Sequence, residues 1–189
     1  MVENNDIEII NLCINGDDSA FSSIVDRYLS AVLNFTYRLC GSREDAEEIT
    51  QETFLKVWKN LRKFKQTENF KTWLYTIARN TTIDKLRKRK DVLFSAFDSD
   101  DGGNFLEDTL PDNELLPDKI FEKEENARMV VGMFENLPVI YKEVLQLYYV
   151  EEMTLVEISK ILNKSVDTVK SQHRRALIQL RKMLEMKNK

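Results

Sequence analysis

The sequence has few of the residues that cross-linked or metal-dependent proteins rely on. Its 189 residues include two cysteines, Cys13 and Cys40, which are too few for a disulfide framework and indicate free thiols in a reducing cytoplasm. His173 is the single histidine, so a zinc site is not expected. Five glycines and three prolines argue against a turn-rich all-β protein. We therefore expect neither a metal nor a cofactor.

Long apolar runs and a leader pattern are missing as well. No stretch approaches the roughly 18 consecutive apolar residues of a membrane-spanning helix. The first ten residues, MVENNDIEII, lack the basic and apolar regions of a signal peptide. With 42% hydrophobic and 32% charged residues, the chain has enough apolar side chains for a buried core. The composition predicts a soluble, cytoplasmic, mostly helical protein.

The charges are strongly segregated, although the net charge is only −4. Residues 55–90 carry 12 basic and 2 acidic side chains, and residues 158–189 carry 9 basic and 2 acidic ones. Residues 91–126, between these two blocks, carry 12 acidic and 2 basic side chains. A single basic block is most simply a solvated helix face. Two such blocks, each at the end of a helical segment, predict two surfaces that meet a polyanion.

Apolar residues recur at helical spacing in two parts of the chain. In residues 1–90 the spacing predicts one helix that Gly41 ends, a second that Ser42 caps, and a third that starts near Asn69. The periodicity fails over residues 91–120, which read as an acidic linker. It resumes over residues 121–189. The expected fold is therefore all-α, with two small helical domains joined by an acidic linker.

Residues 154–182 have the pattern of a helix-turn-helix. Thr154 and Glu157 form a capping box that opens a short helix, Asn163 lies at a turn that needs left-handed backbone, and Ser165 caps a second helix. Short polar and cationic side chains then face outward near the start of the second helix, as in a recognition helix in a major groove. These side chains are Thr168, Lys170, Ser171, Arg174 and Arg175. The plainer alternative is a helical hairpin with a basic outer face; the capping box, the turn and the charge together favour DNA binding.

The helix expected over residues 70–90 mixes aromatic and cationic side chains. Its lysines and arginines suit phosphates, and its aromatic residues suit stacking on unpaired bases. The alternative is that Phe70 and Trp73 belong to the core, which the periodicity favours most for Trp73. The aromatic candidates are Phe70, Trp73 and Tyr75. Asn80, Asp84 and Arg87 repeat at helical spacing on the face opposite the apolar one. Contact with duplex DNA and capture of an opened strand both account for such a surface.

Taken together, these segments resemble a bacterial RNA polymerase sigma factor of the extracytoplasmic-function (ECF) class. Residues 45–64 look like the core-polymerase-binding helix of sigma region two, and residues 70–90 like the segment that recognises and melts the minus-ten element. Residues 137–182 look like sigma region four, which binds the minus-35 element. The resemblance implies a protein that binds core RNA polymerase and promoter DNA, both duplex and opened. It also implies an anti-sigma factor as a partner, which can hold the protein at the inner membrane, and no small-molecule substrate.

The resemblance also implies roles for individual residues. One acidic helix face would meet the polymerase: Asp45, Glu48, Gln51, Glu52 and Leu55. The minus-ten element would lie along a pocket and the helix after it: Lys65, Asn69, Arg79, Asn80, Asp84 and Arg87. The outward residues of the helix-turn-helix would grip the minus-35 duplex, and the acidic linker would thread through the polymerase. Asn163 replaces the glycine that is usual at the turn.

Two other classes of protein compete with this interpretation. A stand-alone helix-turn-helix regulator explains residues 138–185 but leaves residues 45–90 without a role. An enzyme is disfavoured, because the sequence has no glycine-rich phosphate loop, no G-x-S-x-G motif and no histidine-centred site. The sequence thus predicts a sigma factor rather than an enzyme.

Overall fold

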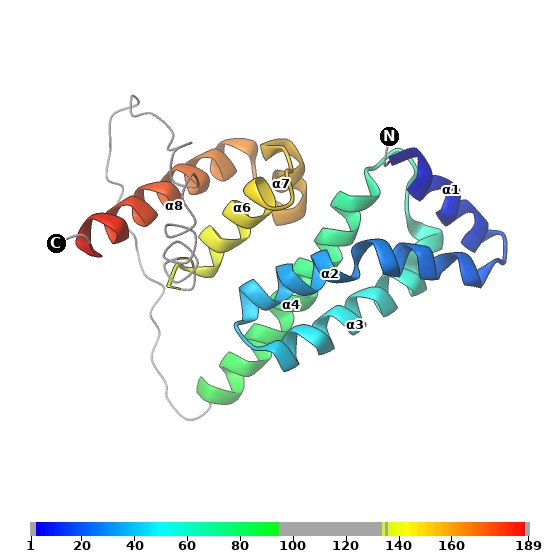
Figure 1. Cartoon of the computed structure of the whole chain (residues 1–189), viewed down its shortest axis with the longest axis horizontal. Helices are drawn as coiled ribbons and strands as arrows, with labels where there is room; N and C mark the ends of the chain where they lie inside the picture. Colours follow the sequence, from blue (N-terminus) through cyan, green and yellow to red (C-terminus); the bar gives the residue numbers. More distant parts are fainter. Residues whose placement is uncertain (1–2, 95–133, 135, 188–189) are drawn as a thin grey trace.

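The computed structural model describes residues 3–94, 134 and 136–187, and the regular secondary structure in these ranges is helical throughout (Figure 1). This confirms the all-α prediction. The first unit contains α1 (Glu3–Ile14), α2 (Phe21–Cys40), α3 (Arg43–Asn60) and α4 (Phe70–Phe94), with 3₁₀ turns at Asp18–Ala20 and Leu61–Lys63. The second unit contains α6 (Val139–Tyr149), α7 (Leu155–Leu162) and α8 (Val166–Lys187).

The helices of the first unit begin and end where local chemistry requires it. Gly41 ends α2 in the left-handed region, at φ 73°, which glycine adopts without a steric penalty. The Ser42 hydroxyl then accepts a hydrogen bond from the Asp45 backbone N–H at 3.3 Å and caps α3. Asn69 does the same for α4, with its side-chain oxygen 3.0 Å from the Thr72 nitrogen. The predicted helix ends near Gly41, Ser42 and Asn69 are confirmed.

The core of the first unit lies between α2, α3 and α4. Phe35 of α2 and Tyr75 of α4 are fully buried and meet edge to face, with their ring centroids 5.2 Å apart. The helix α1, which the sequence analysis did not predict, adds Ile10 and Cys13 to this core. Asp6 of α1 accepts hydrogen bonds from Arg27 and Tyr28 of α2 and so fixes α1 to the bundle.

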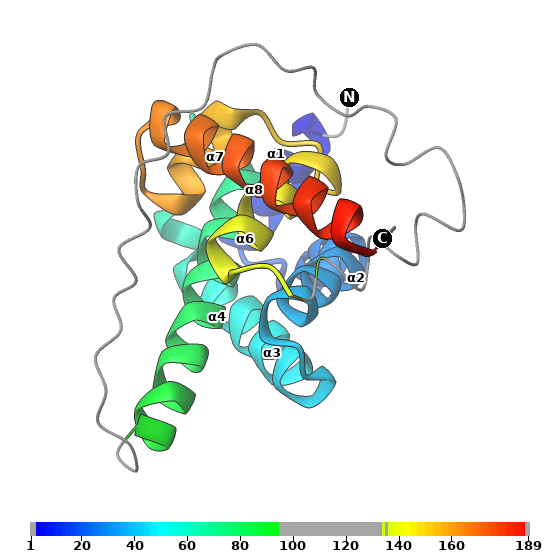
Figure 2. The ribbon, with the colours of Figure 1, turned by 90° about the vertical axis from the view of Figure 1, so that its left-hand side faces the viewer.

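The second unit divides its apolar side chains between two clusters. Leu137, Tyr141 and Leu145 pack with Ala176 and Leu180 of α8 in a small core of their own. The apolar side chains of α7 instead join the cluster that contains Tyr75, because α7 packs against α4. α6 also packs against α2. The two units are therefore in direct contact along α4 (Figure 2).

The boundaries of the predicted domains are only partly covered by the structure. α4 continues to Phe94 and so includes the first four residues of the predicted linker. The rest of the predicted linker, and the helical spacing from residue 121 to 133, lie outside the described residues. Pro138 immediately precedes α6 as its N-cap. No helix of the described ranges is both long and apolar enough to cross a membrane.

Candidate nucleic-acid and partner interfaces

The helix-turn-helix has the local geometry that its sequence predicts. Thr154 accepts a hydrogen bond from the Glu157 N–H at 3.3 Å, and Glu157 accepts one from the Thr154 N–H at 2.8 Å, which completes the capping box. Asn163 ends α7 with a φ of 51° and Ser165 caps α8 through the Thr168 N–H at 3.1 Å. The three-residue turn therefore fixes how α8 leaves α7.

The predicted recognition surface forms one exposed region at the start of α8. Thr168, Lys170, Ser171, Arg174 and Arg175 are all exposed. The Nζ atom of Lys170 lies 3.6 Å from Oδ1 of Asp167 in the same helix. Val169 and Ala176, on the opposite side of α8, are fully buried. This separation of apolar and cationic faces leaves the cationic face open to a ligand.

His173 lies on the inner side of the same helix. It is buried, and its ring contacts Tyr148 and Tyr149 of α6, with centroid distances of 4.7 and 5.6 Å. Burial lowers the pKa of His173 below its ordinary value. The structure thus places His173 in a packing role between α8 and α6. Within the described ranges, no three His, Cys, Asp or Glu residues lie close enough to hold a metal ion.

The predicted minus-ten residues fall into two groups on and before α4. Lys65, Asn80, Asp84 and Arg87 are exposed, the last three along one face of the helix. Asn69 is half-buried as the cap of α4. Arg79 is drawn into the contact between the two units, where its Nε lies 2.9 Å from Oε1 of Glu143 in α6. A strand that follows the exposed face would therefore reach Arg79 only after Glu143 is displaced.

The aromatic residues of α4 belong to the core rather than to the exposed face. Phe70 and Tyr75 are buried, and Phe70 packs against Phe64 and Trp73 at centroid distances of 5.5 and 5.9 Å. Stacking of bases on Phe70 or Tyr75 is therefore ruled out in this conformation. The core alternative is right for Phe70, and Tyr75, which was predicted only as a stacking candidate, is a core residue as well. Trp73 is half-buried in the same cluster.

The acidic face of α3 is partly neutralised by α4. Lys85 of α4 bonds Glu48 at 2.6 Å, and Arg89 bonds Asp45 at 3.0 Å. Glu48 and Glu52 remain exposed, and Glu52 also pairs with Lys56 at 2.8 Å. The carboxylates of Glu48 and Asp45 raise the pKa of Lys85 through the hydrogen bond and the charges. These pairs hold the two helices side by side. Gln51 and Leu55, the other two residues of the predicted face, carry no charge.

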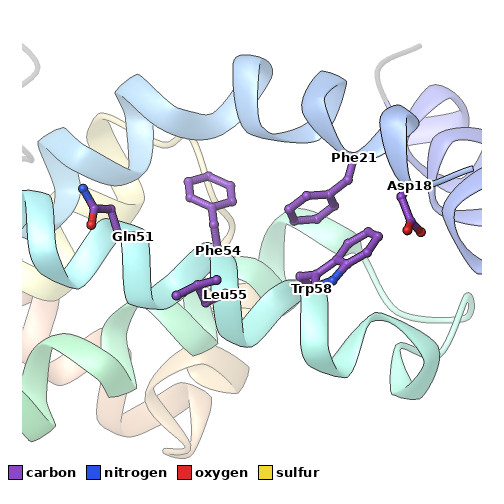
Figure 3. Close-up of a pocket in the computed structure, with 6 residues that line it drawn as sticks. All are labelled: Asp18, Phe21, Gln51, Phe54, Leu55 and Trp58. Atoms are coloured by element: carbon purple, nitrogen blue, oxygen red, sulfur yellow. The ribbon is translucent and has the colours of Figure 1, made fainter.

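Gln51 and Leu55 line a groove between α3 and the start of α2 (Figure 3). The groove has a volume of about 520 Å³, and its other lining residues are Asp18, Phe21, Phe54 and Trp58. Phe21 and Trp58 contact each other with their ring centroids 4.9 Å apart. Leu55 is 57% exposed, and it adjoins the aromatic side chains of the groove. The groove is therefore an apolar patch beside the acidic face.

The sequence gives no direct sign of this groove, or of the carboxylates of Glu143 and Glu151 that contact α4 from the second unit. Phe21 and Trp58 each lie in an apolar stripe at helical spacing. Such a stripe indicates core packing and does not show that the two side chains line a common groove. Glu143 lies among apolar residues of α6. A charged residue in an apolar stretch was the one available sign that its side chain is buried and paired. Neither feature follows from spacing alone, because both depend on how separate helices meet.

Two family models match the chain in consecutive segments. The model of sigma-70 region 2 matches residues 24–92, and the model of sigma-70 region 4 matches residues 134–182. The first covers most of α2 to α4, and the second covers the helix-turn-helix. A stand-alone helix-turn-helix regulator does not account for the first match.

Curated relatives extend over nearly the whole chain. The chain is 36% identical over 170 residues to the ECF RNA polymerase sigma factor SigW of Bacillus subtilis, covering 89% of this chain and 91% of that protein. It is 32% identical over 179 residues to the ECF RNA polymerase sigma-E factor of Haemophilus influenzae, with 91% and 89% covered.

Two solved structures share the fold. CnrH, in a complex with the cytosolic domain of CnrY, aligns with a TM-score of 0.66 at 21% identity, covering 94% of this chain and 96% of CnrH. The sigma factor RpoE of Bartonella quintana, in a complex with the anti-sigma factor NepR, aligns with a TM-score of 0.65 at 22% identity, covering 87% and 96%. The chain therefore belongs to the sigma-70 family of RNA polymerase sigma factors, in its extracytoplasmic-function class, whose members direct transcription initiation at specific promoters.

Proposed function

We propose that three surfaces of this chain divide the work of an ECF sigma factor. The observation that carries the proposal is the exposed cationic start of α8, on a complete helix-turn-helix, in the same chain as the apolar groove beside α3. The cationic start of α8 suits duplex DNA, and the groove beside α3 suits a protein. A factor that binds both brings the protein partner to the DNA.

The surface of α3 is the proposed site for core RNA polymerase. Gln51 and Leu55 supply an amide and an exposed apolar side chain, and the groove can take an apolar side chain of the partner. Apolar and aromatic groups of this kind supply much of the binding energy of protein interfaces. Glu48, Glu52 and Asp45 form the acidic rim and suit a partner with basic residues around an apolar centre. Lys85 and Arg89 of α4 partly neutralise Glu48 and Asp45, so the net negative charge of this rim is smaller than its carboxylates alone would give.

The start of α8 is the proposed site for the minus-35 duplex. Arg174, Arg175 and Lys170 suit guanine edges or phosphates, and Thr168 and Ser171 suit phosphates at the helix end. α4 is the proposed site for the opened minus-ten strand. Lys65 and Asn69 precede the helix, and Arg79, Asn80, Asp84 and Arg87 follow along it. Extrusion of a base costs a few kcal/mol, and a pocket before α4 would offset that cost.

We also propose an anti-sigma factor as a partner and a cytoplasmic site of action, since RNA polymerase works there. The RpoE structure that shares this fold was solved with the anti-sigma factor NepR. We expect the chain to open DNA without an enzymatic reaction of its own. The predicted linker between the domains, residues 91–120, would thread through the polymerase.

Run-off transcription on a library of random promoters tests the proposal. Core RNA polymerase is assayed with and without the full chain, and transcripts that depend on the chain are sequenced. We expect their templates to share two spaced upstream elements, which also identifies the promoter. Binding of the chain to duplex DNA, with no transcript that depends on it, would contradict the proposal and favour a stand-alone regulator.

A further inference from the structure

The turn between α3 and α4, residues 65–69, contains two of the residues proposed to contact the minus-ten element, and we call it the pocket turn. Phe64 before it and Phe70 after it are buried and meet edge to face, with their ring centroids 5.5 Å apart. Within it, the Glu68 backbone N–H donates to the Lys65 carbonyl at 2.9 Å, and Asn69 caps α4. The four side chains before this cap are exposed: Lys65, Gln66, Thr67 and Glu68. The pocket turn is therefore fixed at both ends and presents polar side chains on its surface.

α1 reaches the pocket turn from a distant part of the sequence. The Nε2 amide group of Gln66 donates a hydrogen bond to Oδ1 of Asn11, 55 residues earlier in the chain. α1 also packs against the 3₁₀ turn Leu61–Lys63 and against α4 (Figure 1). Asn11 is half-buried, whereas Gln66 is exposed. One end of this bond thus belongs to a packed helix, and the other lies on a surface that a ligand can reach.

α1 is held in place independently of this bond. Asp6 of α1 is buried and accepts hydrogen bonds from Arg27 and Tyr28 of α2. The ring of Tyr28 in turn meets the ring of Phe70, the first residue of α4, edge to face at a centroid distance of 5.8 Å. α1 and the start of α4 therefore share one anchor. Asn11 consequently occupies a fixed position relative to the pocket turn.

The bond to Asn11 determines how the Gln66 amide can meet a ligand. A glutamine side chain has several rotatable bonds, and ordering it on binding costs conformational entropy. Asn11 takes one N–H of the amide, and within the described residues the second N–H and the carbonyl oxygen have no partner. A donor and an acceptor side by side match a base edge that carries the complementary pair, as a glutamine amide matches adenine. A side chain that is held in one orientation before binding discriminates better than a mobile one.

We propose that Asn11 is a positioning residue for recognition of the minus-ten strand. It holds the Gln66 amide in one orientation, and Gln66 contacts the edge of the extruded base at the pocket turn. This inference rests on the role proposed above for Lys65 and Asn69, and it adds a base-reading side chain and the helix that orients it. The alternative is that the bond only fastens α1 to the bundle. α1 already has the buried anchor Asp6 for that purpose, and a single hydrogen bond near the surface adds little to stability.

Transcription from a randomised minus-ten element tests the proposal. The templates are barcoded copies of a promoter recovered from the run-off library, and core RNA polymerase is assayed with each variant of the full chain. The variants are Asn11→Ala, Gln66→Ala, the double variant, and Asn11→Asp, which keeps an oxygen that accepts from Gln66. The matched control is Asn34→Ala, at an exposed asparagine of α2. Sequencing of the transcripts gives the base preference at each minus-ten position, as the ratio of the preferred base to the next one.

We expect Asn11→Ala and Gln66→Ala each to lower the base preference about fivefold, at one and the same minus-ten position. The double variant should lose no more than the larger of the two single losses, because both substitutions remove one shared interaction. Asn11→Asp and Asn34→Ala should keep the preference of the wild type. Preferences at the other minus-ten positions and affinity for the minus-35 duplex should not change. Urea unfolding verifies that each variant is folded, and Asn11→Leu, which also lacks the acceptor, replaces Asn11→Ala if that variant does not fold.

Three results would overturn the inference. The first is an unchanged base preference in either single variant. The second is a fall in transcription from all templates alike in Asn11→Ala, which is the result expected if the bond only fastens α1. The third is a double variant whose loss is the product of the two single losses, because the two residues would then act independently. Failure of the proposed function looks different: the wild type itself would then support no transcript, and both proposals would fall together.

Discussion

The two cationic helices of this protein, α4 and α8, differ in what their side chains contact. On α4, Arg79, Lys85 and Arg89 are bound by carboxylates of other helices. On α8, Arg175 is exposed, and Lys170 pairs within its own helix. The same residue types therefore serve packing in one helix and present a charged surface in the other. Basic blocks in a sequence indicate a polyanion surface only after their internal partners are known.

The surfaces proposed for core RNA polymerase and for duplex DNA differ in the same way. The first unit offers polymerase an apolar groove beside charges that are already paired. The second unit offers DNA exposed cations. Binding that depends on exposed cations weakens steeply with salt because counterions are released, whereas burial of apolar surface is much less sensitive. The predictions below test this division, from the largest expected effect to the smallest.

Leu55→Asp should have the largest effect. The substitution removes the apolar contact that Leu55 would make with the partner, and it places a carboxylate where binding would strip it of water. We therefore expect about a 100-fold loss of affinity for core RNA polymerase. The matched control is Leu29→Asp, at a leucine of α2 that is 43% exposed and does not line the groove. Titration of labelled protein with core enzyme at two salt concentrations gives both affinities. Equal losses in the two variants would contradict the groove as a binding site.

Arg174→Ala and Arg175→Ala should each weaken binding to the minus-35 duplex by about tenfold, with little change in stability. An arginine contact to a base edge contributes about 1–3 kcal/mol, and loss of a phosphate contact also lowers the salt slope by about 1. Arg181→Ala, further along α8, is the control because Arg181 pairs with Glu185 at 3.3 Å. Affinity for the upstream element as a function of salt separates base contacts from phosphate contacts. An effect of Arg181→Ala as large as that of Arg174→Ala would argue against a localised recognition surface.

Local signals in the sequence were sufficient for the helix ends and for the helix-turn-helix. Ser42, Thr154 and Asn163 act through neighbours within a few residues, so their roles follow from residue type and spacing. The exposed face of α8 follows from helical periodicity in the same way. The helix α1 gave no comparable signal, since its apolar residues are spread around the helix rather than gathered on one face.

Contacts between distant segments were beyond the reach of the sequence. Arg79 has the character of a DNA-binding residue, and its partner Glu143 lies 64 residues away on a different helix. Tyr75 is an aromatic residue next to cations, and its burial against Phe35 of α2 decides its role. Spacing gives the face of a helix, but the partner of that face depends on the tertiary fold.

Removal of helix caps should destabilise the second unit more than the first. Loss of an N-cap side chain typically costs about 1 kcal/mol. Thr154→Ala removes one side of a reciprocal pair with Glu157, whereas Ser42→Ala removes a single hydrogen bond of 3.3 Å. We expect about 1–2 kcal/mol for Thr154→Ala and about 0.5–1 kcal/mol for Ser42→Ala in urea unfolding. A larger loss of unfolding free energy in Ser42→Ala than in Thr154→Ala would contradict this prediction.

The smallest expected effect is a pH dependence that originates in His173. Burial lowers the pKa of His173 in the folded protein, so between that pKa and the ordinary value near 6.5 the unfolded chain binds more protons. The free energy of unfolding should therefore rise with pH through this window and reach its full value above it. Carboxylates titrate near pH 4, and His173 is the single histidine, so the window belongs to this residue. His173→Phe keeps a ring against Tyr148 and Tyr149 and should remove the difference between urea unfolding at pH 5.5 and at pH 7.5. A difference that persists in His173→Phe would place its origin elsewhere and would leave His173 as a packing residue alone.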